Sequence, residues 1–271
     1  MDYRKEYEKW LASPALSEDE RAELKALESN DKEIKARFYG PLEFGTAGLR
    51  GTMYTGLHNM NRHVIRWATQ GFANVIRAEG TEAMKKGVAV CMDCRNHSAE
   101  FARETACVMA ANGIHVRLFE SLRPTPELSF AVREYGCQAG VNVTASHNPK
   151  EYNGYKVYWA DGAQLPPQHA AAIADELTRI DIFTGVRSMD YEQALAEGRI
   201  ELLGEDCDRR FMANVMGMVN DYETVKKVAD DFGLVYTPFH GCGYKLVPEA
   251  LTRLGIRVSA GDQKEIRFTL Q

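Results

Sequence analysis

Hydrophobic positions between about residues 60 and 180 alternate between short apolar runs and stretches with helical spacing. The runs that predict buried strands are Val88–Met92, His115–Phe119, Gln138–Val143 and Gly154–Trp159. The spacing in the intervening stretches predicts helices over Arg62–Glu79, Ser98–Asn112, Pro126–Tyr135 and Pro167–Ile180. This alternation indicates βαβ units, so we expect an α/β fold with a mixed, mainly parallel sheet flanked by helices. The last strand follows the loop after Val143 so closely that we expect it to pair antiparallel.

The first 36 residues predict a helical extension that packs on the main domain. Apolar side chains recur at helical spacing near the start of the chain, at Tyr3, Tyr7, Trp10 and Leu11. Ser17 followed by Glu20 is a capping-box pattern that predicts the start of a second helix over Glu18–Ser29.

A second α/β unit follows the main domain. Residues 182–198 look irregular and polar, and a long helix is predicted over Glu205–Asn220. The predicted order after it is strand Gly233–Tyr236, loop Thr237–Gly243, helix Lys245–Leu254 and a strand near Ile256–Val258. These few strands and helices cannot enclose a hydrophobic core alone. We therefore expect an incomplete second domain. The predicted domains are 1–36, 37–203 and 204–271.

Charge and composition are those of an ordinary globular protein. The net charge is −5 and the pI is about 5.9, so no basic excess indicates nucleic-acid binding. No apolar stretch approaches the length of a membrane span, and the charged N-terminus lacks a signal region. Six scattered cysteines suit reduced thiols. We therefore expect a cytoplasmic protein without nucleic-acid or membrane partners; the sequence does not predict its oligomeric state.

Cys91 and Cys94 form a C-x-x-C pattern with two interpretations. One is half of a zinc or redox site. The other is structural, because Cys91 lies in an apolar run and no second C-x-x-C or C-x-x-H completes a zinc site. We favour the structural interpretation.

The segment Thr144-Ala145-Ser146-His147-Asn148-Pro149-Lys150 collects polar side chains directly after an apolar strand. Open α/β sheets bind ligands at the carboxyl ends of their strands. The segment supplies a hydroxyl at Ser146, an imidazole at His147 and a cation at Lys150, and Lys156 adds a cation on the next strand. Phosphoryl transfer needs a group that carries the phosphate and charges that hold its oxygens. The alternative is a polar surface turn.

Four segments in order resemble the α-D-phosphohexomutases, the superfamily of phosphoglucomutases and phosphomannomutases. Thr144–Lys150 resembles the phosphoserine loop of that family. The other three are Phe44-Gly45-Thr46-Ala47-Gly48-Leu49-Arg50-Gly51, Asp93-Cys94-Arg95 with Ser98, and Asn153-Gly154-Tyr155-Lys156. Tyr236-Thr237-Pro238-Phe239-His240-Gly241 and the N-terminal extension resemble the branch with bacterial phosphoglucomutases and phosphopentomutases. The resemblance runs from about Tyr3 to Ile256.

The resemblance implies a mutase mechanism. Phosphorylated Ser146 would donate its phosphate to a sugar monophosphate, and the resulting bisphosphate would turn in the site and return its other phosphate. Phosphate would thereby move between C1 and C6 of a hexose (glucose or mannose phosphate) or between C1 and C5 of a pentose. A sugar 1,6-bisphosphate would act as activator. The branch resemblance favours glucose, then pentose.

The resemblance also implies roles around Ser146. Lys156 would accept or donate the hydroxyl proton, which requires a lowered pKa that burial and nearby cations can produce. Arg50 would bind phosphate with its guanidinium fork, and His147 and Lys150 would stabilise the charged oxygens. Loop support or phosphate binding is expected from three further residues, Thr144, Asn148 and Arg95.

By resemblance, the reaction needs Mg²⁺ bound to the phosphate on Ser146. In the family, three aspartates of an Asp-Gly-Asp-x-Asp-Arg loop in domain 2 hold this ion, and this sequence contains no such loop. Gly204-Glu205-Asp206-Cys207-Asp208-Arg209 looks similar, but it precedes the start of domain 2, whereas the family loop follows it. We interpret its carboxylates as favourable charges at a helix N-terminus.

The sequence also lacks matches to the sugar-recognition loop of domain 3 and the phosphate-binding loop of domain 4. Residues Ser259–Gln271 match the family poorly, which suggests a frameshift, a premature stop or a gene-model error. We therefore expect little or no mutase activity from the chain alone. The alternative is a non-catalytic, mutase-like fragment that binds phosphate or a partner.

A serine hydrolase that uses Ser146 and His147 is a further alternative, which we reject. Adjacent residues of an extended loop point to opposite sides, and no G-x-S-x-G pattern surrounds the serine.

Overall fold

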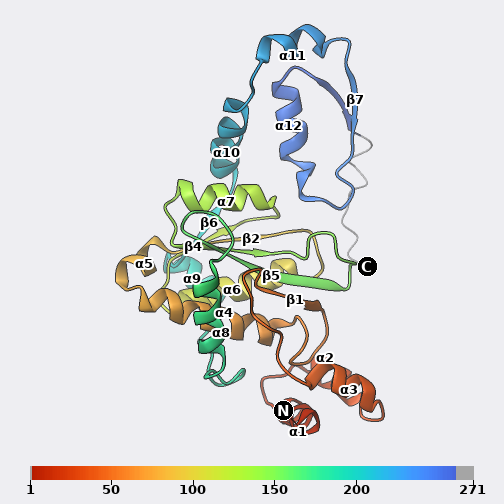
Figure 1. The fold of residues 1–271 in the computed structure, drawn as a ribbon, viewed down its shortest axis with the longest axis vertical. Helices are drawn as coiled ribbons and strands as arrows, with labels where there is room; N and C mark the ends of the chain where they lie inside the picture. Colours follow the sequence, from red (N-terminus) through yellow and green to blue (C-terminus); the bar gives the residue numbers. More distant parts are fainter. Residues whose placement is uncertain (1, 261–271) are drawn as a thin grey trace.

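The computed structural model describes residues 2–260 and arranges them around two sheets (Figure 1). The larger sheet has the strand order β1-β5-β4-β2-β3-β6. Its strands are β1 (Leu49–Thr52), β2 (Val88–Met92), β3 (Val116–Phe119), β4 (Ala139–Val143), β5 (Tyr152–Trp159) and β6 (Ile200–Leu203). β4, β2, β3 and β6 run parallel, whereas β5 pairs antiparallel with both β4 and β1. The predicted fold class and the antiparallel strand are confirmed.

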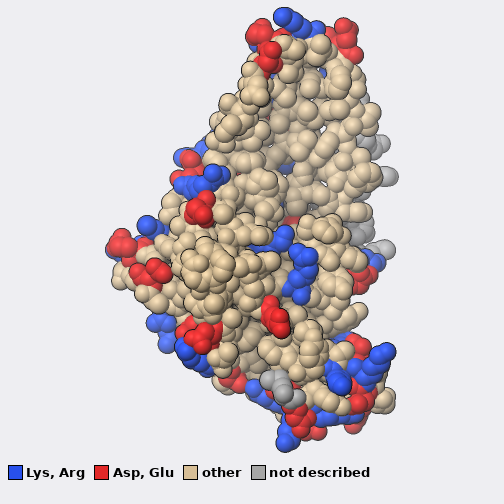
Figure 2. Space-filling view, viewed as in Figure 1, with Lys and Arg blue, Asp and Glu red and all other residues tan. Residues whose placement is uncertain are grey.

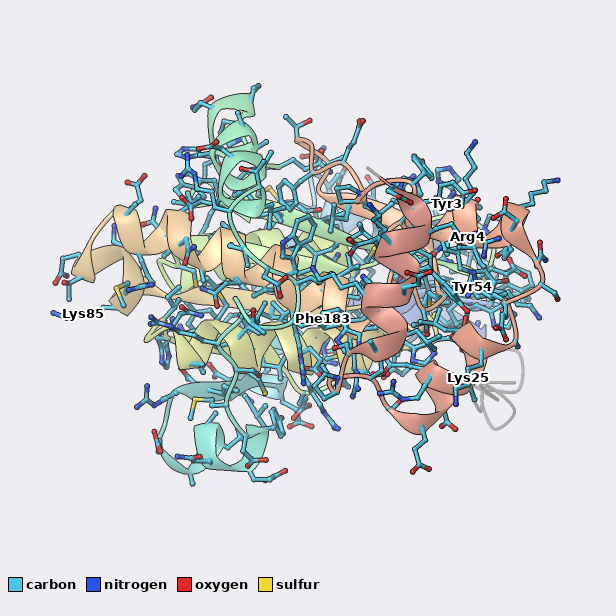
Figure 3. The ribbon with its side chains drawn as sticks, turned by 90° about the horizontal axis from the view of Figure 1, so that it is seen from below. Tyr3, Arg4, Lys25, Tyr54, Lys85 and Phe183 are labelled. Atoms are coloured by element: carbon cyan, nitrogen blue, oxygen red, sulfur yellow. The ribbon has the colours of Figure 1, made fainter. Side chains whose placement is uncertain are left out.

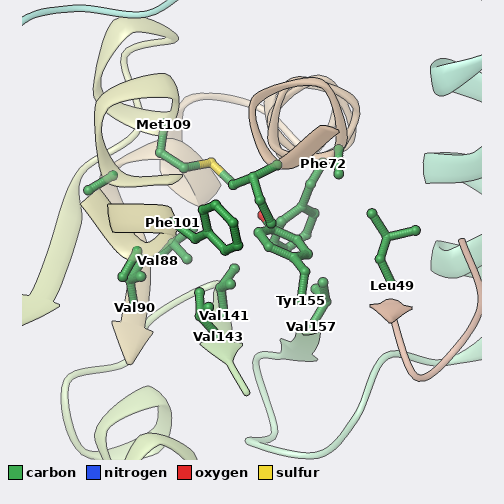
Figure 4. Packing of buried hydrophobic residues seen from close by; sticks show 14 of the residues in the cluster. Leu49, Phe72, Val88, Val90, Phe101, Met109, Val141, Val143, Tyr155 and Val157 are labelled. Atoms are coloured by element: carbon green, nitrogen blue, oxygen red, sulfur yellow. The ribbon is translucent and has the colours of Figure 1, made fainter. Parts of the chain in front are cut away.

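Helices cover both faces of this sheet (Figure 1). One face carries α4 (Arg62–Ala78), α6 (Ser98–Ala111) and α8 (Pro167–Leu177), and the other carries α7 (Thr125–Glu134). The buried valines of β2 and β4 pack against Phe72 of α4 and Phe101 of α6 (Figure 4). On the opposite face, a Cβ at Gly140 would lie 2.7 Å from a methyl group of Val132. Gly140 therefore lets α7 approach the sheet closely.

Three helices precede the sheet, namely α1 (Tyr3–Ala12), α2 (Glu18–Lys25) and α3 (Asp31–Phe38). The predicted capping box is present: Ser17 Oγ accepts from the backbone N–H of Glu20 at 3.2 Å, and the Glu20 carboxylate accepts from the N–H of Ser17 at 2.8 Å. α3 is absent from the prediction because its eight residues hold only one apolar pair at helical spacing.

The packing of these helices on the main domain is also confirmed. Trp10 of α1 is fully buried, with edge-to-face ring contacts to Phe38 and Phe183. Figure 3 shows Phe183 beside the N-terminal helices. Because aromatic side chains bury the largest apolar areas, this contact anchors the extension.

Residues 182–198, predicted to be irregular, contain the helix α9 (Tyr191–Ala196) and lead into β6. The prediction of irregular structure was wrong for the residues of α9, and β6, just beyond this range, extends the sheet by pairing with β3. β6 is a short edge strand with Leu202 47% exposed, so its sequence lacks the alternation that indicates a strand. Two more short helices, α5 (Thr81–Lys86) and α11 (Tyr222–Ala229), also went unpredicted.

The second unit follows the helix α10 (Glu205–Gly217). β7 (Gly233–Tyr236) and β8 (Arg257–Ala260) pair in parallel, and α12 (Leu246–Arg253) connects them after a short 3₁₀ turn, Cys242–Tyr244. Exposed apolar side chains mark this unit, with Val235 76% and Phe239 74% exposed. Figure 2 shows few charged side chains on its visible face below the tip. The described elements match the predicted order of strand, loop, helix and strand, and the incompleteness of this domain stays a prediction. The three domain bounds stay predictions, and residues 261–271, which we expected to match the family poorly, lie outside the described residues.

A buried ionic cluster joins the two units. Arg123, which is 1% exposed, donates to both carboxylate oxygens of Asp208 at 2.6 and 3.0 Å. Lys245, from the second unit, donates to the same carboxylate at 2.5 Å. Glu127 is fully buried nearby, and its oxygens accept no hydrogen bond from the described residues. Burial and the adjacent Asp208 raise the pKa of Glu127 to about 8, which favours the protonated carboxyl at neutral pH.

Within residues 2–260, no helix combines the length and apolar character needed to cross a bilayer.

Replacing Glu127 by Gln should flatten the pH dependence of stability. A carboxyl group with a raised pKa keeps a proton in the folded state that the unfolded chain releases above about pH 4.5. The folded state therefore loses stability as the pH rises from about 4.5 to about 8. We expect the free energy of unfolding to fall by up to about 1.4 kcal/mol per pH unit in this window, and less in Glu127→Gln.

Urea unfolding at about pH 5.5 and about pH 8 measures this difference. Glu192→Gln, an exposed position on α9, is the control and should keep the pH slope of the unmodified chain. Equal slopes for Glu127→Gln and Glu192→Gln would contradict the assignment of a protonated Glu127.

Candidate active site

The Thr144–Lys150 loop leaves the carboxyl end of β4 beside the carboxyl end of the parallel strand β2. The N–H of Asp93, just after β2, donates to the carbonyl of Val143 at 3.1 Å, so the two loops start side by side. Figure 1 shows this edge of the sheet facing the second unit. The loop therefore lies at the sheet edge where α/β folds bind ligands.

Ser146 is exposed and has a left-handed backbone conformation with φ 56°. For a residue with a Cβ atom this conformation costs of order 1–3 kcal/mol and persists only where the surroundings impose it. Here both backbone groups are bonded: the N–H donates to Thr144 Oγ1 at 3.1 Å, and the carbonyl accepts from Arg95 Nη2 at 2.7 Å. The loop thereby presents the serine hydroxyl at the surface.

Arg95 holds the whole loop through backbone carbonyls. Its Nη2 donates to Ser146 and to Asn148 (2.6 Å), and its Nη1 donates to Pro149 (2.8 Å) and to Tyr152 (3.0 Å). The structure thus assigns Arg95 to loop support, because these bonds occupy both terminal nitrogens. Phosphate binding, the other role predicted for this residue, would require breaking some of them.

The imidazole of His147 lies on the same side of the loop as the serine hydroxyl, with His147 Nδ1 3.4 Å from Ser146 Oγ. The argument that adjacent residues point to opposite sides was therefore wrong, because the left-handed Ser146 turns the chain. A hydrolase triad still lacks its third member, since no carboxylate among residues 2–260 bonds to His147.

Arg50 and Lys156 reach the site from the two antiparallel strands. Arg50 on β1 is exposed and lies opposite Gly154, two residues before Lys156 on β5. Burial, and then the charge of Arg50, lower the pKa of Lys156, while Asp93 opposes the shift. A lowered pKa is the property that a proton acceptor needs here. The role of each residue stays a prediction.

Three cations lie on the loop of Ser146 and on the strands β1 and β5. None of Arg50, Lys150 and Lys156 has an ion-pair or hydrogen-bond partner in the described part of the chain, although the Asp93 carboxylate acts electrostatically on Lys156. Cations that make no ion pair favour binding of an anion such as a phosphate group.

Thr144 and Asn148 act mainly through the local turn. Thr144 is buried, and its N–H donates to the Gly154 carbonyl at 3.1 Å. The N–H of Asn148 donates to Ala145 at 3.1 Å and closes the turn around Ser146. Asn148 Oδ1 is buried and has no partner within residues 2–260.

Two glycines in the matched segments allow close backbone contacts that the sequence alone did not reveal. A Cβ at Gly154 would lie 2.6 Å from the Thr144 carbonyl oxygen. Gly48 has φ 76°, and a Cβ there would lie 1.8 Å from the carbonyl oxygen of Tyr155. The segment before Arg50 can therefore lie directly on β5.

The predicted Mg²⁺ ligand, a phosphate on Ser146, stays a prediction. Within residues 2–260, no three His, Cys, Asp or Glu side chains are grouped to hold a metal ion. Two of the three carboxylates of the similar-looking segment are paired with cations: Asp208 binds Arg123 and Lys245, and Asp206 binds Arg209 and Arg210. The described residues therefore do not fit a magnesium cage, and we derive no step through the ion.

The cysteines match the structural interpretation in one respect. Cys91 is fully buried in β2, as predicted, and donates to the Arg123 carbonyl at 3.3 Å. Cys94 is half-buried and donates to the His240 carbonyl at 2.5 Å. This contact brings the segment 236–241 of the second unit beside the loop that carries Arg95.

The phosphoglucomutase/phosphomannomutase, alpha/beta/alpha domain I, family profile matches residues 41–182. This range contains the loop, Arg50, Arg95 and Lys156. The chain therefore belongs to the phosphoglucomutase/phosphomannomutase family, as the resemblance of its motifs predicted.

Curated relatives and solved structures agree with this assignment. A phosphoglucomutase of Staphylococcus saprophyticus is 33% identical over 224 residues, 83% of this chain and 39% of that protein. A phosphoribomutase of Saccharomyces cerevisiae is 34% identical over 225 residues, 80% of this chain and 36% of that protein. The open form of parafusin, a phosphoglucomutase of Paramecium, shares the fold with a TM-score of 0.62 at 21% identity, over 80% of this chain and 43% of its own. The chain thus spans under half the length of these relatives.

Replacing Arg95 by Lys should loosen the loop. A lysine ammonium cannot reach four carbonyls that a planar guanidinium bonds together. Because carbonyls left without a donor lose their bonds to a charged group, we expect unfolding free energy to fall by about 2 kcal/mol or more. Urea unfolding measures this loss.

Arg179→Lys is the matched control, because Arg179 is 62% exposed and pairs only with carboxylates on the surface. Its stability should change by less than about 0.5 kcal/mol. An Arg95→Lys chain as stable as Arg179→Lys would rule out the support that we assign to Arg95.

Proposed function

We propose that the chain carries the phosphoserine site of a phosphosugar mutase, an isomerase in which Ser146 holds the transferred phosphate. One observation carries this proposal: Ser146 is exposed in an imposed left-handed turn, and Arg50, Lys150 and Lys156, on its loop and on the strands β1 and β5, make no ion pair in the described part of the chain. A nucleophile that must accept and release a phosphoryl group needs this combination of access and positive charge.

Each transfer exchanges one phosphorus–oxygen bond for another. In the first, the bond from Ser146 Oγ to phosphorus breaks, and a bond forms to a hydroxyl oxygen of the sugar monophosphate. The neutral amine of Lys156 accepts the sugar hydroxyl proton, and the resulting ammonium gives this proton to Ser146 Oγ, which leaves as a hydroxyl. After the bisphosphate reorients, the reverse chemistry returns its other phosphate to Ser146. Arg50, His147 and Lys150 balance charge on the phosphoryl oxygens.

We propose a hexose phosphate, glucose or mannose, as the substrate, with phosphate moving between C1 and C6. The phosphoglucomutase among the relatives supports this proposal, whereas the phosphoribomutase favours a pentose as the alternative. A sugar 1,6-bisphosphate fits as activator, since it can phosphorylate an empty Ser146. Mg²⁺ is proposed on the resemblance alone.

Incubation with glucose 1,6-bisphosphate and Mg²⁺ should add one phosphate to the 271-residue chain, as measured by intact mass. Ser146→Ala should abolish the gain because the accepting oxygen is missing. Ser121→Ala, which removes a serine outside the loop, should keep it. Phosphate uptake by Ser146→Ala would place the phosphate elsewhere and contradict the proposal.

The rate of this uptake should rise with pH. Phosphorylation of Ser146 requires that the hydroxyl proton move to a neutral Lys156 amine. Because burial and Arg50 lower the pKa of Lys156, the rate should level off below the ordinary lysine value. Lys156→Arg stays protonated and should lose about 100-fold or more of the rate.

The matched control is Lys85→Arg, an exposed lysine far from the loop that pairs with Glu82 (Figure 3). It should keep both the rate and the pH profile. An unchanged profile in Lys156→Arg would remove Lys156 from the proton transfer and leave Ser146 phosphorylation standing.

A further inference from the structure

A chain of hydrogen bonds, anchored by the buried side chains of Ser98 and Asn153, connects the support of the Ser146 loop to β5. Asp93 Oδ1 accepts from the Arg95 backbone N–H at 2.9 Å and from Ser98 Oγ at 2.8 Å. Ser98 Oγ in turn accepts from Asn153 Nδ2 at 3.0 Å, and the same amide donates to the Asn96 carbonyl at 3.0 Å. Ser98 and Asn153 are both fully buried. Sequence reasoning named Asp93, Ser98 and Asn153 only as parts of matched segments.

Asn153 uses its whole amide in this chain. Its two donor bonds go to the loop and helix after β2, and its Oδ1 accepts from the N–H of Gly154 at 2.8 Å. A buried amide with every bond made holds its partners at fixed distances, because each lost bond would leave a buried polar group unpaired.

The bonds form a closed ring through Ser146. From its carbonyl the ring passes through Arg95, Asp93 and Ser98 to Asn153. From the next residue, Gly154, it returns by the carbonyl bond to the Thr144 N–H and by the Thr144 hydroxyl to the Ser146 N–H. Both backbone groups of the strained serine are thereby tied to the strand that carries the proposed proton acceptor.

We infer that Asn153 is a positioning residue for phosphoryl transfer, which sets Ser146 relative to Lys156 by closing this ring. The inference rests on the proposed function of Ser146. Asn153 lies three residues before Lys156 on β5 and touches neither reacting atom. Without the Asn153 amide, the segment from Asp93 to Ser98 loses two bonds to β5. The Arg95 guanidinium in this segment, which holds the loop, is then less firmly positioned. A displacement of about 1 Å at a reacting group can cost about 100-fold in rate.

Amide hydrogen exchange tests the ring without relying on activity. In Asn153→Ala, the amides of Thr144, Ser146 and Asn148 should exchange about tenfold faster than in the unmodified chain. Ser98→Ala, which removes one hydroxyl and is the milder change, should give the same pattern. The matched control is Asn112→Ala, a buried amide at the other end of α6 that bonds to Gln70. It should leave the exchange of the loop amides unchanged.

Phosphate uptake from glucose 1,6-bisphosphate provides the second measurement. Asn153→Ala and Ser98→Ala should lower the maximal rate by about 10- to 100-fold, with the half-saturating concentration within about twofold. Asn112→Ala should keep both values despite its loss of stability. Because one ring is broken in each case, the double variant Ser98→Ala/Asn153→Ala should be little slower than Asn153→Ala alone.

The outcomes separate this inference from the proposed function. If loop exchange or the maximal rate changes equally in Asn153→Ala and Asn112→Ala, Asn153 acts only through stability and the inference is wrong. A loss confined to the half-saturating concentration would also overturn it. If the unmodified chain takes up no phosphate, the proposed function is wrong, and Asn153 then has no role in phosphoryl transfer. The exchange measurement then still decides whether Asn153 orders the loop.

Discussion

The guanidinium of Arg95 is the group on which the geometry of the site depends. Three of its four bonds go to carbonyls of the loop and the fourth goes to Tyr152 at the start of β5, while the loop itself closes with the turn from Ala145 to Asn148. Arginine suits this task because its donors are fixed in one plane and its charge does not titrate. The loop can therefore expose Ser146 to solvent and still keep its left-handed backbone conformation, which is unfavourable in a flexible chain.

The sheet order explains how charges from distant segments reach that serine. β5 runs antiparallel to β4 and lies between β4 and β1, so Lys156 and Arg50 both stand on strands next to the loop. β2 is the other neighbour of β4, and the loop that follows β2 carries Arg95. The site thus draws one segment from each side of β4. The glycines at 48 and 154 allow these segments to touch through their backbones.

The sequence was most informative where packing and local pattern agree. β2 and β7 match their predicted bounds, because a short apolar run between turn residues marks each of them, although only β2 is buried. The edge strand β6 escaped prediction because only part of it is buried. Motif resemblance located the loop, but it could not show that Ser146 is left-handed or that Arg95 bonds carbonyls, since both depend on contacts between distant segments. Likewise, nothing near Glu127 in sequence indicates its neighbour Asp208.

The antiparallel placement of β1 has a consequence for how the protein folds. Arg50 and Lys156 are about a hundred residues apart, and every strand pair around Ser146 joins segments distant in sequence except β4 with β5. Contacts of this kind form slowly, because the entropy cost of closing a long loop comes before the contacts contribute any stabilising free energy. During synthesis, the serine loop is therefore assembled only after β5 has emerged and met a β1 strand made much earlier. A nascent chain therefore has Lys150 near Ser146 before Arg50 joins them on β1, so under the proposed function the complete site is a late product of folding.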